Sequence, residues 1–189
     1  MTREELRSKE SETQSAGWHM LSAFVSLAII AGLVIWLDQL TKDWVRSNLA
    51  LGETWRPFSW LPEYVRIVHW RNSGAAFGLF QGGGGVFAIL AVIVTLMIIF
   101  YFPRIQRGDW SLRLAMGLQL GGAVGNLIDR LQHNLAVTDF IAVGNFPVFN
   151  IADSAITLGV IILFFSIWLG SGNESEHKPE LGKERAASE

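Results

Sequence analysis

Residues 86–102 read VFAILAVIVTLMIIFYF, an apolar run whose only polar side chains are Thr95 and Tyr101. Its length is close to the roughly 20 residues with which an α-helix crosses the hydrocarbon core of a bilayer. Three further runs share this character: residues 18–37, 112–128 and 151–169. Together the four runs hold 73 residues but only two charged side chains, Arg113 and Asp153. The sequence therefore predicts a mainly α membrane protein with four transmembrane helices.

The composition of the 189 residues agrees, with 50% hydrophobic and 17% charged residues, where soluble domains have roughly 25% charged. Residues 1–17 and 170–189 hold 15 of the 32 charges, so we expect two polar, solvated tails around a domain at 18–169. The first run has no small-residue cleavage site, so it is predicted to be a retained span. A net charge of −2 without a long basic run argues against nucleic-acid binding. With no cysteine, the chain is not itself a lipoprotein.

Four spans put residues 38–85 and 129–150 on one side of the membrane, and both tails with residues 103–111 on the other. Counted with residues 103–113, the tail side holds nine Lys and Arg residues against six on the other side, which favours cytoplasmic termini. The segments Tyr64–Trp70 and Ala136–Val143 alternate like strands, and Gly82–Gly85 is predicted to be a flexible hinge. We expect a small extracytoplasmic sheet, which would form a cradle over a bound substrate.

The third run carries polar groups on one helix face. Gln119, Gly122, Asn126 and Asp129 follow one another at three- and four-residue spacings. Gly117, Gly121 and Gly125 recur every fourth residue, a pattern that lets another helix approach closely. In the structural interpretation, Asn126 forms a hydrogen bond to a neighbouring helix and Asp129 pairs with Arg130. In the functional interpretation, these residues belong to an active or binding site, because polar groups inside a membrane are costly and usually serve a function.

The fourth run begins with a polar pair. Asn150 fits a helix N-cap, which would place Asp153 at the third helical position, where a carboxylate accepts backbone N–H bonds. Span parity puts Asp129, Asp139 and Asp153 on the same side of the membrane. Asp38 and Lys42 lie there too, and their four-residue spacing predicts an interfacial salt bridge in which the lysine extends toward the lipid surface.

Two common kinds of hydrolytic site lack their residues. The histidines at 19, 69, 133 and 177 are scattered and no His-Glu-x-x-His occurs, which argues against a zinc protease. Ser154 lies in no Gly-x-Ser-x-Gly motif, which argues against a serine hydrolase. Two carboxylates that share a proton remain, and such a pair hydrolyses amides without a metal. Spacing alone leaves open whether Asp129 or Asp139 joins Asp153.

A proton-coupled transporter or channel is the alternative, since buried aspartates also relay protons. The run 86–102, with no polar residue beyond Thr95 and Tyr101, offers little to a path across the membrane.

Five ordered motifs between residues 18 and 169 resemble those of the bacterial signal peptidase II (lipoprotein signal peptidase) family. They are Asp38-Gln39-x-x-Lys42, Asn72-x-Gly-Ala-Ala-Phe77, Gly121-Gly-Ala-x-Gly-Asn126-x-x-Asp129-Arg130, Val137-x-Asp139-Phe140 and Phe149-Asn150-x-Ala152-Asp153-x-x-Ile156.

This resemblance implies an inner-membrane aspartic endopeptidase without a cofactor or metal. Its substrates would be prolipoproteins with a diacylglyceryl cysteine, cut on the amino side of that cysteine, and globomycin-type peptides would inhibit it. The resemblance assigns Asp139 and Asp153 as the catalytic dyad and makes Asp38 with Lys42 a structural or lipid-facing pair. The residues implied to position the dyad or the substrate are Asn72, Asn126, Asp129, Arg130 and Asn150.

Overall fold

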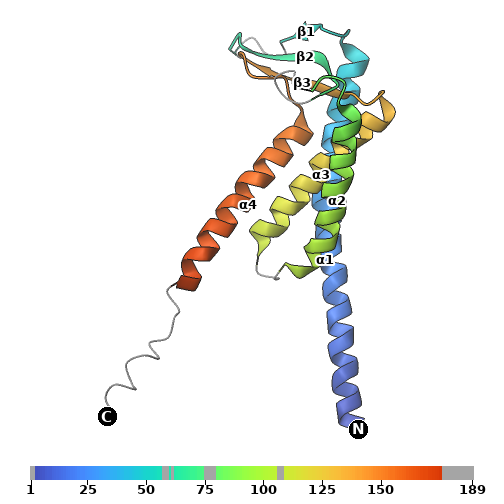
Figure 1. Cartoon of the computed structure of the whole chain (residues 1–189), viewed down its shortest axis with the longest axis vertical. Helices are drawn as coiled ribbons and strands as arrows, with labels where there is room; N and C mark the ends of the chain where they lie inside the picture. The colour runs from blue at the N-terminus through green and yellow to red at the C-terminus, as the bar shows by residue number, and fades with distance from the viewer. Residues whose placement is uncertain (1–2, 57–59, 61, 75–79, 106–108, 176–189) are drawn as a thin grey trace, which may run out of the picture.

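The computed structural model describes residues 3–56, 60, 62–74, 80–105 and 109–175. Within them lie four α-helices: α1 (Arg3–Asn48), α2 (Gly84–Tyr101), α3 (Trp110–Gln132) and α4 (Ile151–Ser175). The strands are β1 (Thr54–Trp55), β2 (Val65–Asn72) and β3 (Val137–Val143), and a short 3₁₀ helix, η2 (Phe102–Arg104), follows α2. The sheet lies at one end of the helices, and α4 runs away from it, diverging from α1 (Figure 1).

Three of these helices are long and apolar enough to cross a membrane: Met20–Asn48 within α1, Gly84–Arg104 comprising α2 and η2, and Ile151–Leu169 within α4. These match the first, second and fourth predicted spans. The third predicted span, 112–128, forms most of α3. That helix packs against α1, α2 and α4, and ten of its residues are buried. A helix enclosed by others needs less apolar surface than one facing lipid, so its composition is more polar.

The first helix is longer than predicted at both ends. It begins at Arg3, so residues 3–17 are helical instead of an unordered tail. A formed helix extends at lower cost than it nucleates, and the apolar part of α1 supplies the nucleus. At its other end α1 continues past residue 37 to Asn48, because Asp38 and Lys42 find partners inside the protein.

Glycines let the other helices approach α3 closely. A Cβ added at Gly121 would lie 2.6 Å from Val34 of α1, and one at Gly122 would overlap the carbonyl oxygen of Ala152 on α4. The predicted close approach is therefore confirmed. An apolar core between α1, α2 and α3 supports the same arrangement, formed by Ala23, Leu27, Ala31, Ile98, Phe102 and Leu120.

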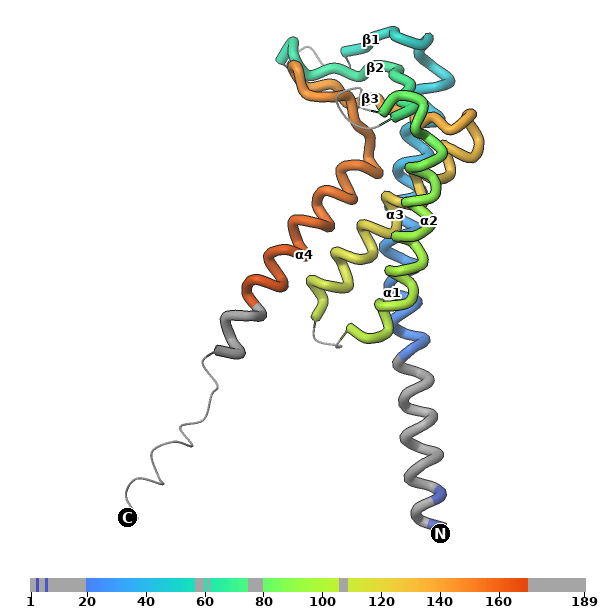
Figure 2. Tube along the Cα trace, viewed as in Figure 1, coloured from blue at the N-terminus to red at the C-terminus, as the bar shows by residue number. Residues whose placement is uncertain are grey.

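The predicted sheet is also confirmed. Its order is β1-β2-β3 and both pairings are antiparallel. Opposite Trp70 on β2 lies Asp139, and opposite Arg71 lies Thr138, with an irregularity between Ile67 and Trp70. Because successive side chains point to opposite faces of a strand, Thr138 and Asp139 face different sides of the sheet. The Cα trace shows the sheet at the C-terminal end of α1 (Figure 2).

The Gly82–Gly85 run is not a free hinge. Gly82 has φ +83°, which glycine adopts without strain, but α2 begins at Gly84. A Cβ at Gly84 would overlap the carbonyl oxygen of Leu135, in the loop before β3. The run therefore anchors α2 against that loop. Residues 75–77 of the Asn72-x-Gly-Ala-Ala-Phe77 motif lie outside the described residues.

Candidate active site

Asp139 is held by two amide side chains. It lies on β3 with 1% of its surface exposed. Its Oδ2 accepts a hydrogen bond from Asn72 Nδ2 of β2 at 2.9 Å, and its Oδ1 accepts one from Asn150 Nδ2 at 2.7 Å. Phe149 bridges Ile141 of β3, which brings Asn150 to this position. Both donors fix the orientation of the carboxyl group without adding a charge.

Asp153 is held at the start of α4 by a reciprocal cap. Its backbone N–H donates to Asn150 Oδ1 at 2.9 Å, and the Asn150 N–H donates to Asp153 Oδ2 at 3.2 Å. This geometry confirms the predicted N-cap. The other carboxylate oxygen, Oδ1, accepts from Asn126 Nδ2 of α3 at 2.8 Å. Asn150 Nδ2 also lies 3.2 Å from Asn126 Oδ1, so the two amides connect both carboxyl groups.

Asp139 and Asp153 line one cavity of about 620 Å³. Its polar lining also includes Asn72, Asn126 and Arg130. The apolar lining comes from α2, β3, the segment before α4, and α4 itself: Phe87, Val137, Phe146, Pro147, Val148, Phe149, Ile156, Leu158 and Ile161. The cavity thus joins a polar end at the sheet to an apolar wall along α4, which suits a ligand with both kinds of surface.

The pKa of Asp139 is raised to about 7. The largest cause is burial, and the charge of Asp153 adds to it. The hydrogen bonds from Asn72 and Asn150 and the charge of Lys42 act in the opposite direction. At neutral pH Asp139 therefore holds a proton for a substantial part of the time, which suits a group that gives and takes protons in a reaction.

A buried ionic cluster lies next to Asp139 and Asp153 and is connected to Asp153 through Asn126. Lys42 Nζ is 2.7 Å from Asp38 Oδ2 and 3.4 Å from Asp129 Oδ2, and all three side chains have 0% exposure. Arg46 Nη1 is 3.2 Å from Asp129 Oδ1. The predicted salt bridge between Asp38 and Lys42 is confirmed. Of the two roles expected for the pair, structural or lipid-facing, the lipid-facing one is wrong, because both side chains are buried inside the protein.

The predicted pairing of Asp129 with Arg130 is also wrong. The partners of Asp129 are Lys42, Arg46 and the backbone N–H of Thr138, which donates at 2.8 Å. Arg130 instead donates to the Asn126 carbonyl at 3.3 Å. Asp129 does not line the cavity whereas Arg130 does. Successive residues of α3 point about 100° apart, and two cations on α1 attract the carboxylate away from the dyad.

Sequence reasoning missed three residues that organise the site: Gln39, Arg46 and Thr138. Gln39 Nε2 donates to Asp38 Oδ2 and to the Gly125 carbonyl, both at 3.1 Å. Arg46 Nη1 donates to Thr138 Oγ1 at 2.9 Å. Arg46 could have been found, since it follows Asp38 and Lys42 at the same four-residue spacing.

Within the described residues no three metal-ligating side chains of the His, Cys, Asp or Glu type gather into a group that could hold an ion. His133 is the histidine one turn from Asp129, and its Nδ1 lies 4.0 Å from Asp129 Oδ1, beyond hydrogen-bond distance.

Known proteins share this architecture. The family described as Signal peptidase (SPase) II matches residues 30–169. A lipoprotein signal peptidase of Shouchella clausii is 42% identical over 147 residues, which cover 77% of this chain and 95% of the relative. A lipoprotein signal peptidase of Bacillus subtilis is 39% identical over 154 residues, which cover 79% of this chain and 97% of the relative. A solved bacterial membrane enzyme has a TM-score of 0.71 and 32% identity, covering 78% of this chain and 90% of its own. The chain therefore belongs to the signal peptidase II family.

Proposed function

We propose that this chain is an intramembrane aspartic endopeptidase that removes the signal peptides of prolipoproteins carrying a diacylglyceryl cysteine. It cuts on the amino side of that cysteine. The family supports a protease, and the names of the relatives support lipoprotein precursors as substrates. One observation carries the aspartic mechanism: Asp139 and Asp153 line the same cavity and are connected through Asn126 and Asn150.

In the proposed reaction Asp139 begins protonated and Asp153 ionised. Asp153 takes a proton from a water molecule, and the oxygen of that water attacks the scissile carbonyl carbon. At the same time Asp139 donates its proton to the carbonyl oxygen. The tetrahedral intermediate then collapses: the C–N bond breaks, the leaving nitrogen takes the proton from Asp153, and Asp139 recovers its own. The raised pKa of Asp139 supports its assignment as the acid. No metal or cofactor takes part.

The shape of the cavity supports a lipid-modified substrate. Along α4 its lining changes from Asp153 at the sheet end to Ile156 and Ile161 one and two turns further along the helix. Apolar parts of a substrate would lie against that wall, while the peptide bond reaches the dyad. Arg130, which also lines the cavity, would bind a peptide carbonyl. Globomycin-type peptides would compete for the same space.

The proposed enzyme lies in the bacterial cytoplasmic membrane with four spans, α3 being the third. Its termini are cytoplasmic, and its sheet forms an extracytoplasmic cradle beside the dyad. The sheet lies at the end opposite the start of α1, which supports placing the sheet and the N-terminus on opposite sides of the membrane (Figure 1). The excess of Lys and Arg on the tail side supports cytoplasmic termini.

Cleavage of a purified lipidated prolipoprotein by dyad variants tests this function. Asp139→Asn and Asp153→Asn each remove a proton-transfer group at nearly constant shape, so each should lower the rate by at least about 10²-fold. Glu63→Gln, at a side chain 93% exposed, is the control, and a strong chelator should leave the wild-type rate unchanged.

Asp129→Asn distinguishes the two candidate dyads. This variant should be less stable but retain measurable cleavage, because Asp129 holds Lys42 and Arg46 instead of lining the cavity. An inactive, well-folded Asp129→Asn beside an active Asp139→Asn would transfer the assignment to Asp129 with Asp153.

A further inference from the structure

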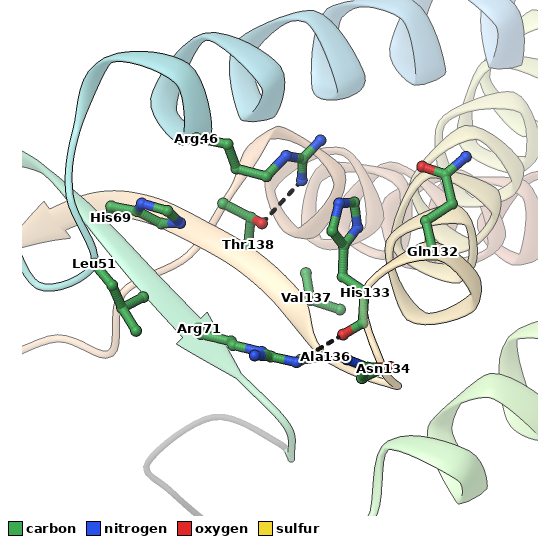
Figure 3. Close-up of a pocket in the computed structure, with 10 residues that line it drawn as sticks. All are labelled: Arg46, Leu51, His69, Arg71, Gln132, His133, Asn134, Ala136, Val137 and Thr138. Carbon is green, nitrogen blue, oxygen red and sulfur yellow. Dashed lines mark hydrogen bonds between the residues drawn. The ribbon is translucent and has the colours of Figure 1, made fainter.

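A second cavity, of about 380 Å³, lies beside the sheet. Figure 3 shows how three parts of the chain meet around it: Arg46 from α1, His69 and Arg71 from β2, and His133 at the end of α3. Gln132 and Asn134 add side-chain amides. Neither aspartate nor glutamate appears among the described lining residues.

This cavity does not include the dyad. Val137 lines both cavities, but Thr138 lines only this one, whereas the next residue, Asp139, lines only the larger cavity. Thr138 and Arg71 are opposite each other in the β2–β3 register, so both side chains lie on the face of the sheet that Asp139 does not share. The function proposed above uses Arg46 only as a partner of Asp129 and Thr138, and it does not use Arg71.

The polar groups around the cavity are held in place before any ligand binds. Arg46 is 17% exposed, its Nη1 donates to Asp129 and Thr138, and its Nη2 donates to Asp43, so its charge is compensated by two carboxylates. His69 Nδ1 lies 2.8 Å from the Leu49 carbonyl oxygen, to which it donates. Arg71 Nη2 donates to the His133 carbonyl at 3.0 Å, and no carboxylate of the described residues forms an ion pair with Arg71. Its charge is thus not balanced by a neighbour.

We propose that this cavity binds a phosphate-class anion, either inorganic phosphate or the phosphodiester of a lipid headgroup. The planar guanidinium of Arg71 can bind two phosphate oxygens together, and the side-chain amides of Gln132 and Asn134 supply further hydrogen-bond donors around the cavity. The volume accommodates a phosphate with a small substituent but not acyl chains. The cavity lies where α1 and α3 end, so a lipid could present its headgroup while its chains stay in the bilayer.

The test uses the full-length protein in a neutral detergent. Inorganic phosphate is titrated by ³¹P NMR at constant ionic strength, and native mass spectrometry counts retained phosphatidylglycerol, phosphatidylcholine and diacylglycerol. Arg71→Gln should weaken phosphate-class binding about tenfold, the effect of one lost charge-assisted contact. Arg66→Gln is the matched control, because Arg66 is exposed on the same strand and does not line the cavity.

Asn134→Asp provides an independent arm if Arg71→Gln does not fold. Asn134 is exposed with φ 52°, a conformation that aspartate also tolerates, and the new carboxylate would repel an anion. Retention of phosphatidylglycerol without binding of inorganic phosphate would identify a lipid-headgroup site. Binding of inorganic phosphate without retention of phosphatidylglycerol would identify a site for a soluble anion. Binding of neither, or equal binding by the Arg71→Gln and Arg66→Gln variants, would overturn the proposal.

Discussion

Replacing Asp139 by asparagine should change how the stability of the protein depends on pH. The folded protein holds the pKa of this carboxyl group at about 7, while its ordinary value is 3.8. Between these values the folded state keeps a proton that the unfolded chain has already released. Stability therefore falls as pH rises from about 4 to about 7, and above that the loss is complete.

The size of the effect follows from the two pKa values. The complete loss corresponds to about 4 kcal/mol, and about 2–3 kcal/mol of it lies between pH 5 and pH 8. An asparagine at this position does not titrate, so that part of the pH dependence should disappear from the variant.

The replacement also has a cost that does not depend on pH. Both oxygens of Asp139 accept from amide donors, Asn72 and Asn150. An introduced amide would direct its NH₂ group at one of them, and losing that hydrogen bond costs about 1–3 kcal/mol. For this reason the informative quantity is the change in the free energy of unfolding between pH 5 and pH 8, because a cost that does not depend on pH cancels from this difference.

Chemical denaturation in detergent at the two pH values measures the free energy of unfolding. Relative to wild type, Asp139→Asn should gain about 2–3 kcal/mol between pH 5 and pH 8. Asp153→Asn should reduce the wild-type pH dependence in part, since the charge of Asp153 is the second cause of the raised pKa. Glu63→Gln should leave it unchanged. An Asp139→Asn protein that keeps the wild-type slope would refute the assignment of a proton to Asp139.

Two further predictions concern the ionic cluster and the topology. Lys42→Met leaves Asp38 and Asp129 without their shared cation and should destabilise the protein by about 3–5 kcal/mol. Thermal unfolding should show that adding Asp38→Asn restores part of this stability. A Lys42→Met protein as stable as the double variant would contradict the buried ion pair. Reporters inserted at Asp109 and Asn134 should give opposite readouts, cytoplasmic and extracytoplasmic, and matching readouts would exclude the four-span arrangement.

The helices and the sheet could be predicted from sequence because each has a local signal. Residues 86–102 are apolar throughout, and α2 occupies Gly84–Tyr101. Alternation in Tyr64–Trp70 and Ala136–Val143 predicted β2 and β3. The ends of α1 could not be predicted in this way. Residues 3–17 lack the apolar pattern that indicates a helix, and polar residues at 38–48 indicate surface unless their partners elsewhere in the chain are known.

The choice between Asp129 and Asp139 also required contacts distant in sequence. Both residues are fully or almost fully buried, and both lie on the same side by parity, so neither exposure nor spacing separates them. What differs is the partner chemistry: Asp129 faces the cations of α1, and Asp139 faces the amides Asn72 and Asn150. Only the fold determines which partner each carboxylate finds.

That difference has a chemical consequence for the proposed dyad. Contact with a cation favours the ionised form of a carboxyl group and lowers its pKa, so a lysine bound directly to Asp139 would oppose the protonated state the reaction needs. Lys42 instead ends on Asn126 Oδ1 at 3.0 Å, and the amide of Asn126 continues to Asp153. Neutral amides can fix two carboxyl groups in position while transmitting little charge. The cluster around Lys42 can therefore stabilise the fold next to the dyad while Asp139 keeps a pKa of about 7.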